Sequence, residues 1–419
     1  MPALRGLAAA RIFLCFASAY FLSYAFRSIN AVIAPDLQGD IGLQNADLGL
    51  LSSAYFLSFA ALQLPLGIWL DKYGPRRTES ALLIFAAIGA AIFASSTTLT
   101  GLWIGRALIG VGVSACLMAP YKAYRQWFAP EQQSQLASWM LVAGTLGALA
   151  STMPVSAALP LIGWRGVFWV MCGMIVATSI AIFFLLRKLE AAQGTPKAPP
   201  AQANAAPLAQ LGYAHIFSNP YFRRMGLLGV VNHGSFSALQ TLWVGPWMMT
   251  VLGMSKQATA QALFIFNLCM MLAYLGMSWW APRHVSHAKG SGIPAMRVIA
   301  LGIGGAVIVQ AAMLMISAPW SWALWLILAV CVTVTTLTQT GVSLSFPVAL
   351  AGRANSAFNL MVFIGSFAIQ WGIGLLIDLF GSYGMTAPDA MRAAFAVCVA
   401  MQAAALAVFV LGRAQPTLH

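Results

Sequence analysis

The residues best suited to bind a ligand lie in the first long apolar run of the sequence, residues 12–34. Tyr20, Tyr24, Arg27 and Asn30 follow at i, i+4, i+7 and about i+10, so a helix would place them on one face. A guanidinium about 24 Å along such a helix lies past the middle of a bilayer. It is costly there unless it meets an anion, which it can hold through two parallel hydrogen bonds. Arg27 is therefore a candidate anion-binding residue, and the alternative is a side chain that extends to the outer membrane surface.

A second polar face is predicted in the run 223–249. His233, Ser237 and Gln240 are spaced at i, i+4 and i+7, and Trp243 continues the same face. Histidine titrates near physiological pH, so His233 could carry a proton or donate a hydrogen bond to an anion. The alternative is a neutral histidine that is hydrogen-bonded to a neighbouring helix. His233, Gln240 and Trp243 are accordingly candidate substrate contacts, with His233 also a candidate for coupling.

Few other polar groups occur within the apolar runs. Asn267, Gln310, Gln339 and Asn359 lie near the middle of their runs, where each could contact a substrate or form a packing hydrogen bond between helices. Carboxylates are nearly absent, and Asp378 near the end of its run is the nearest acidic candidate. Candidate substrate contacts thus include Asn267 and Asn359, and no paired carboxylates, nucleophile or metal cluster indicates an enzyme or a cofactor.

These residues must be positioned by membrane helices. Only 7% of the 419 residues are charged and 60% are hydrophobic, whereas soluble domains carry roughly 25% charged residues. This composition excludes a soluble enzyme, a disordered protein and a nucleic-acid binder. Runs of about 20 apolar residues, long enough to cross a bilayer, occur twelve times, near 12–34, 48–70, 79–98, 103–125, 136–160, 165–187, 223–249, 259–281, 296–317, 321–345, 355–380 and 391–412.

An Ala/Pro/Gln-rich stretch, 188–220, divides these runs into six and six. The expected domains are therefore an N-terminal six-helix bundle over 1–187, a linker over 188–220 and a C-terminal six-helix bundle over 221–419. Most of the 22 Lys and Arg residues fall on one side of the resulting topology. The positive-inside rule then places the linker and both termini in the cytoplasm, as in a multi-pass protein of a bacterial inner membrane.

The loop after the second run carries a motif that points to a family. Gly67-Ile-Trp-Leu-Asp71-Lys-Tyr-Gly74-Pro-Arg76-Arg77 resembles the G-x-L-a-D-[RK]-x-G-[RK]-[RK] signature of the major facilitator superfamily. The resemblance implies an all-α integral membrane protein with 12 transmembrane helices in two pseudo-symmetric six-helix bundles. It also implies that Gly67, Asp71, Gly74, Arg76 and Arg77 form a conformational latch.

Two further stretches extend this resemblance. Arg106-Ala-Leu-Ile-Gly110-Val-Gly112 is similar to a second family signature, R-x-x-x-G-x-G, so Arg106 is a candidate either for coupling or for bonding to loop carbonyls near the outer end. Tyr24-Ala-Phe-Arg27-Ser-Ile-Asn30 resembles the Y-x-D-R-x-N pattern of organic anion:cation symporters, which implies that Arg27 contacts a substrate carboxylate. The acidic positions of that group are Phe26 and Val113 here, so its usual proton carriers are missing.

The expected function is a secondary active transporter of a small organic anion, a carboxylate-type metabolite, that works by alternating access. Uptake is favoured over export because the Gly-Pro signature of drug antiporters is absent from the fifth run. The alternative is efflux of an uncharged or amphipathic compound. The expected partners are the substrate, the lipid bilayer and a proton as candidate co-substrate, with no nucleic acid, no cofactor and no metal, and a monomer is sufficient because both halves lie in one chain.

Overall fold

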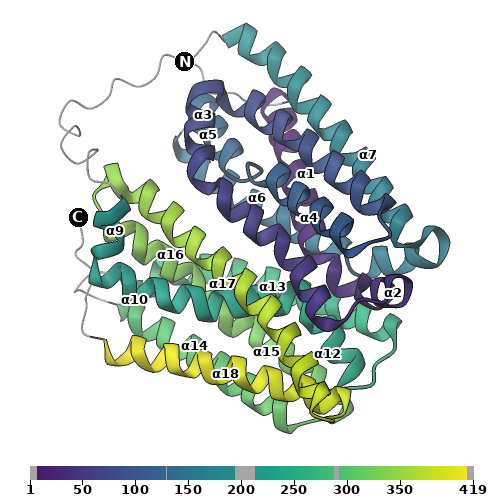
Figure 1. Ribbon diagram of the computed structural model, residues 1–419. Coiled ribbons are helices and arrows are strands. Elements are labelled where there is room, and N and C mark those ends of the chain that lie inside the picture. The colour runs from purple at the N-terminus through teal and green to yellow at the C-terminus, as the bar shows by residue number, and fades with distance from the viewer. Residues whose placement is uncertain (1–6, 129, 194–212, 287–291, 413–419) are drawn as a thin grey trace. The chain divides into compact units, whose positions relative to one another are not determined.

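A computed structural model describes residues 7–128, 130–193, 213–286 and 292–412 (Figure 1). Almost all of these residues are helical, and the described strands are β1 (Val285–Ser286) and β2 (Ile293–Pro294), a short parallel pair. The chain forms two compact units. The first comprises Met1–Leu43 and Leu50–Pro199, and the second comprises Gln44–Gly49 and Pro200–His419.

The first unit is built from long helices with two sharp bends. Gly74 (φ 78°, ψ 167°) divides α3, and Gly163 (φ 65°, ψ 172°) divides α7, since positive φ is a conformation that glycine adopts without strain. The expected runs 48–70 and 79–98 are thus the two parts of α3. The helices are α1 (Leu7–Ser28), α2 (Asn30–Ile41), α3 (Asn45–Ser95), α4 (Leu99–Val113), α5 (Met118–Trp127), α6 (Pro130–Ala150) and α7 (Met153–Gln193).

Close approach of α1 and α6 depends on two glycines. A Cβ on Gly147 would overlap the carbonyl oxygen of Phe21, and a Cβ on Gly144 would lie 2.6 Å from the ring of Tyr20. Small residues at membrane-helix interfaces permit this kind of backbone contact. Gly144 and Gly147 therefore fix where the Tyr20–Arg27 face of α1 lies against α6.

The second unit contains helices that are interrupted more often. After α9 (Tyr213–Ser218), the remaining elements are α10 (Pro220–Leu228), η2 (Gly229–His233), α11 (Gly234–Ala238), η3 (Leu239–Trp243), α12 (Val244–Thr250), α13 (Lys256–His284), α14 (Ala295–Met315), η4 (Pro319–Ala323), α15 (Leu324–Cys331), η5 (Val332–Val334), α16 (Thr335–Leu344), α17 (Val348–Ser382) and α18 (Ala387–Leu411). The helical path from α10 to α12 contains the two π-turns η2 and η3. The path from η4 to α16 contains the two 3₁₀ turns η4 and η5.

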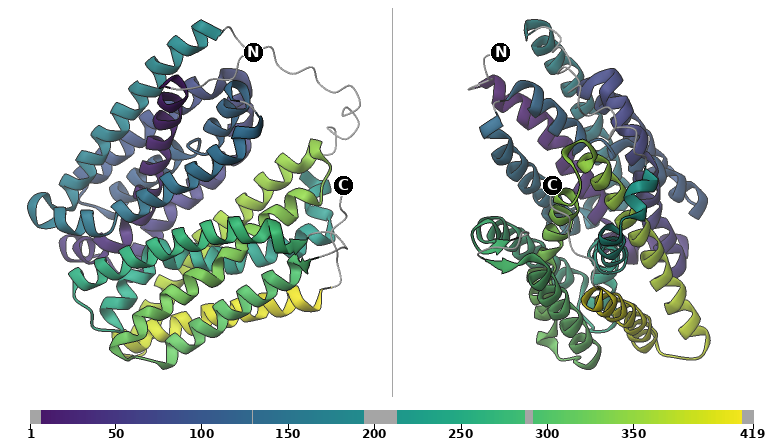
Figure 2. Two further views of the ribbon diagram at one scale, coloured as in Figure 1. Left: turned by 180° about the vertical axis from the view of Figure 1, so that it is seen from behind. Right: turned by 90° about the vertical axis from the view of Figure 1, so that its left-hand side faces the viewer.

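Neighbouring helices of the second unit pack along their lengths. α14 runs along α18, and α17 contacts α18 and approaches it toward the end at which the two helices are joined (Figure 1 and Figure 2). Between α14 and α18, the buried amides of Gln310 and Gln402 donate to each other at 3.0 Å. Gln310, a candidate substrate contact from sequence, is therefore used here as a packing hydrogen bond between helices.

Nine helical segments of the described chain are long and apolar enough to cross a membrane. Three of the expected runs are helical but are not among these nine segments. They lie in the first part of α3 (run 48–70), in α6 with the start of α7 (run 136–160) and in α10–α12 (run 223–249). The all-α membrane fold is confirmed, while the number of twelve spans stays a prediction. Of the expected linker 188–220, residues 194–212 lie outside the described residues, and its two ends are helical in α7 and α9.

Candidate functional site

Arg27 lies in the last turn of α1 among four aromatic rings. Its Cζ atom is 4.7 Å from the ring centre of Tyr24, 5.5 Å from that of Tyr55 and 5.6 Å from that of Phe59. The ring centre of Phe56 is 6.0 Å away. The guanidinium can interact with the π-faces of these rings. Arg27 and Tyr24 are half-buried, whereas most of their neighbours on α1 are fully buried, so the cluster retains an accessible face.

Arg106 of α4 holds the end of α1 in place. Its side chain is only 1% exposed, and its Nη1 donates a 2.7 Å hydrogen bond to the carbonyl oxygen of Phe26. The last carbonyls of a helix have no partner within the helix, so this charge-assisted bond satisfies one of them. Of the two roles expected for Arg106, the structure shows bonding to a carbonyl, but that carbonyl lies in the last turn of α1 rather than in a loop, and a role in coupling stays a prediction.

The remaining candidates on the α1 face lie at different depths. Asn30, the first residue of α2, is 1% exposed and donates from Nδ2 to the Ser52 hydroxyl at 2.5 Å. Tyr20 donates to the Tyr24 hydroxyl at 3.4 Å. Tyr24 and Arg27 thus form the accessible part of the predicted face, and Asn30 is turned toward α3.

The second unit contains the other predicted face. His233, Ser237 and Gln240 are half-buried between fully buried neighbours, which agrees with one shared face. His233 ends the π-turn η2, and Gln240 lies in the π-turn η3. Single π-turns inside α-helices are frequent at functional sites. Gln240 Nε2 donates to Asn267 Oδ1 of α13 at 3.2 Å, so two of the predicted contacts are joined.

The other predicted contacts of the second unit differ in exposure. Asn359 is half-buried and accepts a 3.4 Å hydrogen bond from Gln339. Trp243 is fully buried, and its indole nitrogen donates to the carbonyl oxygen of Gln370 at 3.0 Å. Trp243 therefore joins η3 to α17 in this conformation, and its contact with substrate stays a prediction.

Two buried amides were not predicted as site residues. The side chains of Asn232 and Gln370 are 6% and 0% exposed, and neither has a hydrogen-bond partner among the described residues for its amide nitrogen or oxygen. Buried polar groups are nearly always hydrogen-bonded, so each exception requires an explanation. Asn232 directly precedes His233 in the sequence, and this adjacency is the signal that could have identified Asn232 as a site residue.

The segment 67–77, expected as a loop after the second run, is helical with a bend at Gly74. Gly74 provides the positive φ between the two parts of α3, and Gly67 has no described atom within 4 Å of the position of a Cβ, so close helix contact at Gly67 is not observed. Arg76 is buried, with its Nη1 donating to the carbonyl of Phe183 at 3.4 Å, whereas Arg77 is exposed. The side chain of Asp71 lies outside the described part of the structure, and the latch role stays a prediction.

Glu79 corrects the expectation that Asp378 is the nearest acidic candidate. Glu79 lies in the second part of α3, within a candidate membrane span, and its side chain is 0% exposed. The residue starts the apolar run 79–98 two positions after Arg77, so in the sequence it resembles a loop charge. Asp378 instead accepts hydrogen bonds from Asn45 Nδ2 at 2.9 Å and from the Ala46 backbone nitrogen at 2.7 Å, at the start of α3.

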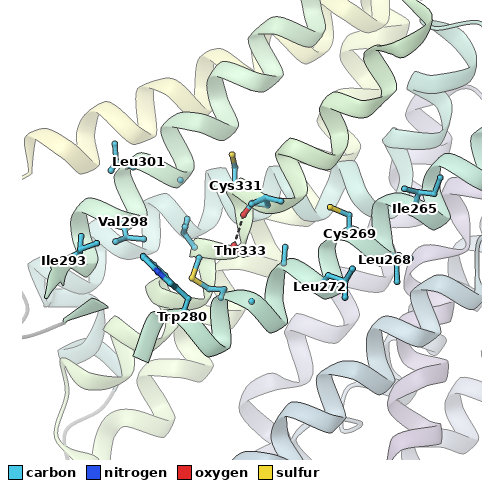
Figure 3. Close-up of a pocket in the computed structure, with 16 residues that line it drawn as sticks. Ile265, Leu268, Cys269, Leu272, Trp280, Ile293, Val298, Leu301, Cys331 and Thr333 are labelled. Atoms are coloured by element: carbon cyan, nitrogen blue, oxygen red, sulfur yellow. Dashed lines mark hydrogen bonds between the residues drawn. The ribbon is translucent and has the colours of Figure 1, made fainter. Parts of the chain in front are cut away.

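A large groove in the second unit contains none of the predicted site residues. It has a volume of about 900 Å³ and is lined by α13, α14 and the α15–η5 segment (Figure 3). Its lining is almost entirely apolar, with Leu268, Leu272, Trp280 and Leu301 among its side chains. Exposed apolar side chains on membrane-spanning helices suit contact with lipid chains, so we do not assign the groove to a charged substrate.

Comparison with known proteins gives matches along most of the chain. The Major Facilitator Superfamily profile matches residues 16–370. A nitrate/nitrite transporter from Picosynechococcus is 34% identical over 27% of this chain and 21% of its own length. A hexuronate transporter from Escherichia coli K12 is 26% identical over 35% and 34%, and a 4-hydroxybenzoate transporter from Pseudomonas aeruginosa is 24% identical over 66% of each chain. The matches therefore span at most 66% of the length of these three relatives.

Solved structures show the same fold. A D-xylose–proton symporter has a TM-score of 0.77 at 13% identity, with 97% of this chain and 98% of that chain covered. A bacterial homologue of the human lysosomal transporter Spinster, in an inward-facing conformation, has a TM-score of 0.74 at 15% identity, with 97% of both chains covered. Because the family profile matches most of the sequence and these neighbours share its fold, the chain belongs to the major facilitator superfamily.

Proposed function

We propose that this protein is a secondary active transporter that moves a small organic anion of the carboxylate type across a bacterial inner membrane. The observation that carries this proposal is the half-buried guanidinium of Arg27 among the rings of Tyr24, Tyr55, Phe56 and Phe59. Cationic side chains inside membrane spans mark substrate or ion pathways. The names of three relatives, for nitrate/nitrite, hexuronate and 4-hydroxybenzoate, share an anionic substrate.

In this proposal, Arg27 neutralises the anion and Tyr24 orients it. The planar guanidinium binds a carboxylate through two parallel hydrogen bonds, which a lysine would not reproduce. The rings restrain Arg27 by cation–π contacts, so its charge is held ready for the substrate. Arg106 contributes by fixing the backbone of Phe26, the residue that precedes Arg27.

The second unit supplies uncharged recognition groups in the same proposal. His233 and Gln240 are half-buried on one face, and Asn267 accepts from Gln240. These groups, with Asn359, can donate to or accept from the polar atoms of an organic anion. The nearby amides of Asn232 and Gln370 are additional donors whose hydrogen-bonding capacity is not used within the described chain.

Transport by alternating access needs no nucleotide, and we propose uptake with a co-transported proton as the driving reaction. The protein would act as a monomer with both termini in the cytoplasm, in agreement with the distribution of Lys and Arg in the sequence. The segment 67–77 would act as the conformational latch, with Gly74 as its bend.

The test is uptake of radiolabelled carboxylates, such as benzoate and hexuronate types, by purified protein in liposomes. Loss of a hydrogen bond to a charged group costs about 1.5–3 kcal/mol, so Arg27→Ala should reduce uptake at low substrate concentration roughly 10- to 100-fold. Arg27→Lys should retain part of the activity. The matched control is Arg125→Ala, because Arg125 is an exposed arginine of the same unit.

Two results would contradict the proposal. The first is carboxylate uptake that is as fast in Arg27→Ala as in the unmodified protein. The second is transport of uncharged amphipathic compounds with no carboxylate uptake, which would establish the efflux alternative.

A further inference from the structure

Glu79 is buried in the first unit, and side chains from three other segments interact with it. The thiol of Cys15 in α1, the thiol of Cys116 between α4 and α5, and the phenol of Tyr124 in α5 interact with it electrostatically. All three side chains are at most 8% exposed. Thiols and phenols are neutral at pH 7 by their ordinary titration, so they offer no positive charge to a carboxylate.

The cationic groups of the neighbouring segments contact other groups. Arg27, which interacts electrostatically with Cys116, lies among four aromatic rings. On the same helix as Glu79, the guanidinium of Arg76 lies 5.0 Å from the ring centre of Phe183. On α5, Lys122 donates from Nζ to the carbonyl of Leu70 at 2.8 Å. Both carboxyl oxygens of Glu79 are buried without a partner of ordinary hydrogen-bond geometry among the described residues, and the group that interacts with them most directly is the thiol of Cys116, a weak donor.

An ionised carboxylate in such surroundings is expensive. Removing a charge from water costs several kcal/mol unless a counter-charge or several hydrogen bonds compensate. The neutral acid avoids this cost, because it has no net charge and its hydroxyl can rotate toward a neighbouring thiol or phenol oxygen. The conformation described here therefore selects the protonated form of Glu79.

We propose that Glu79 is a proton-binding site whose occupancy is coupled to the conformation of the protein. The inference rests on the proposed transport function, because alternating access supplies the second conformation in which the site is hydrated. A proton bound in one conformation and released in the other changes the equilibrium between them by the difference in its binding free energy. Glu79 follows the bend at Gly74 by five residues on α3, so a change at the segment 67–77 is transmitted directly to its pocket.

The first test does not depend on the substrate. In infrared difference spectra of the reconstituted protein, a buried protonated carboxyl gives a C=O stretching band distinct from that of ionised carboxylates. We expect this band in the unmodified protein, its loss in Glu79→Gln and its retention in Asp40→Asn, which makes the same carboxylate-to-amide change at an exposed residue of the same unit. An absent band, or a band that persists in Glu79→Gln, would overturn the proposal.

The second test measures coupling in liposomes. Glu79→Gln imitates the protonated acid, so it should lose accumulation driven by a pH gradient while substrate exchange across the membrane stays within about twofold of that of the unmodified protein. Glu79→Asp keeps an acid and should keep gradient-driven accumulation, which controls for misfolding. Gradient-driven accumulation by Glu79→Gln at the unmodified level would refute the assignment. Failure of the transport proposal is distinguishable, since carboxylate exchange would then be absent in every variant, whereas the infrared band reports Glu79 alone.

Discussion

Arg106 Nη1 donates a 2.7 Å hydrogen bond to the carbonyl oxygen of Phe26, the residue immediately before Arg27. A fully buried arginine on α4 thus fixes the turn of α1 that carries the candidate anion-binding residue. The bond connects stability to function, because the same side chain satisfies a helix-end carbonyl and limits where Arg27 can point. Its removal should consequently affect both properties.

Arg106→Met should destabilise the protein and weaken substrate binding. An unsatisfied buried carbonyl costs about 1–3 kcal/mol, so we expect a lower free energy of unfolding and a raised KM for the carboxylate. Denaturant unfolding in detergent and initial uptake rates measure the two effects. Arg125→Met, at an exposed residue, is the control and should change neither by much. An unchanged KM would separate Arg106 from the positioning of Arg27.

Tyr24→Ala should raise the KM for the anion by about 2- to 30-fold, which corresponds to the roughly 0.5–2 kcal/mol of a cation–π contact. Tyr24→Phe keeps the ring 4.7 Å from the Arg27 guanidinium and should change KM much less. The control is Tyr383→Ala, because Tyr383 is 75% exposed. Equal effects of the Ala and Phe substitutions would assign the contribution to the Tyr24 hydroxyl rather than to its ring.

Gly147→Ala should destabilise the packing of α1 on α6. Its Cβ would overlap the carbonyl oxygen of Phe21, and overpacking of a tight interface costs about 1–3 kcal/mol. Gly173→Ala on α7 is the matched control, because no described atom lies within 4 Å of its Cβ position. Thermal unfolding in detergent should show a lower midpoint for Gly147→Ala alone. A midpoint equal to that of the control would mean that α1 and α6 can separate without cost.

His233→Gln should raise the KM for the anion but preserve the dependence of uptake on a pH gradient. Glutamine keeps hydrogen-bonding groups at the half-buried face of His233 and Gln240, while the proton is bound at Glu79 in our proposal. Uptake with and without a gradient, compared with Glu79→Gln, measures this. If His233→Gln abolished the gradient dependence and retained substrate exchange, the proton site would have to be assigned to His233.

The helix faces of the candidate site could be predicted from the sequence. The spacing of Tyr24 and Arg27, and that of His233, Ser237 and Gln240, fixes which side chains share a face, and all five are half-buried in the structure. The helical period depends only on residues that are close in the sequence, so the shared face can be predicted without knowledge of tertiary packing. The same holds for the apolar runs that form the helices.

The groups around these faces could not be predicted in this way. Tyr55, Phe56 and Phe59 belong to α3, and only the packing of α3 against α1 brings their rings to Arg27. Glu79 could not be identified from the sequence for the same reason. Next to Arg76 and Arg77, it resembles a hydrated loop residue. Its burial beside Cys15, Cys116 and Tyr124 depends on interactions with residues that are distant in the sequence. The π-turns η2 and η3 have no sequence signature in these residues.

The two π-turns also determine how the helical path from α10 to α12 tolerates changes in its length. A π-turn contains one residue more than the α-helical turn it replaces, so deleting one residue within Leu239–Trp243 would convert η3 to an α-turn and keep the flanking residues in register. The same deletion within α14, a regular helix, would rotate every later residue by about 100°. The segment that carries His233 and Gln240 can therefore lose one residue at each π-turn while the flanking helix keeps its register.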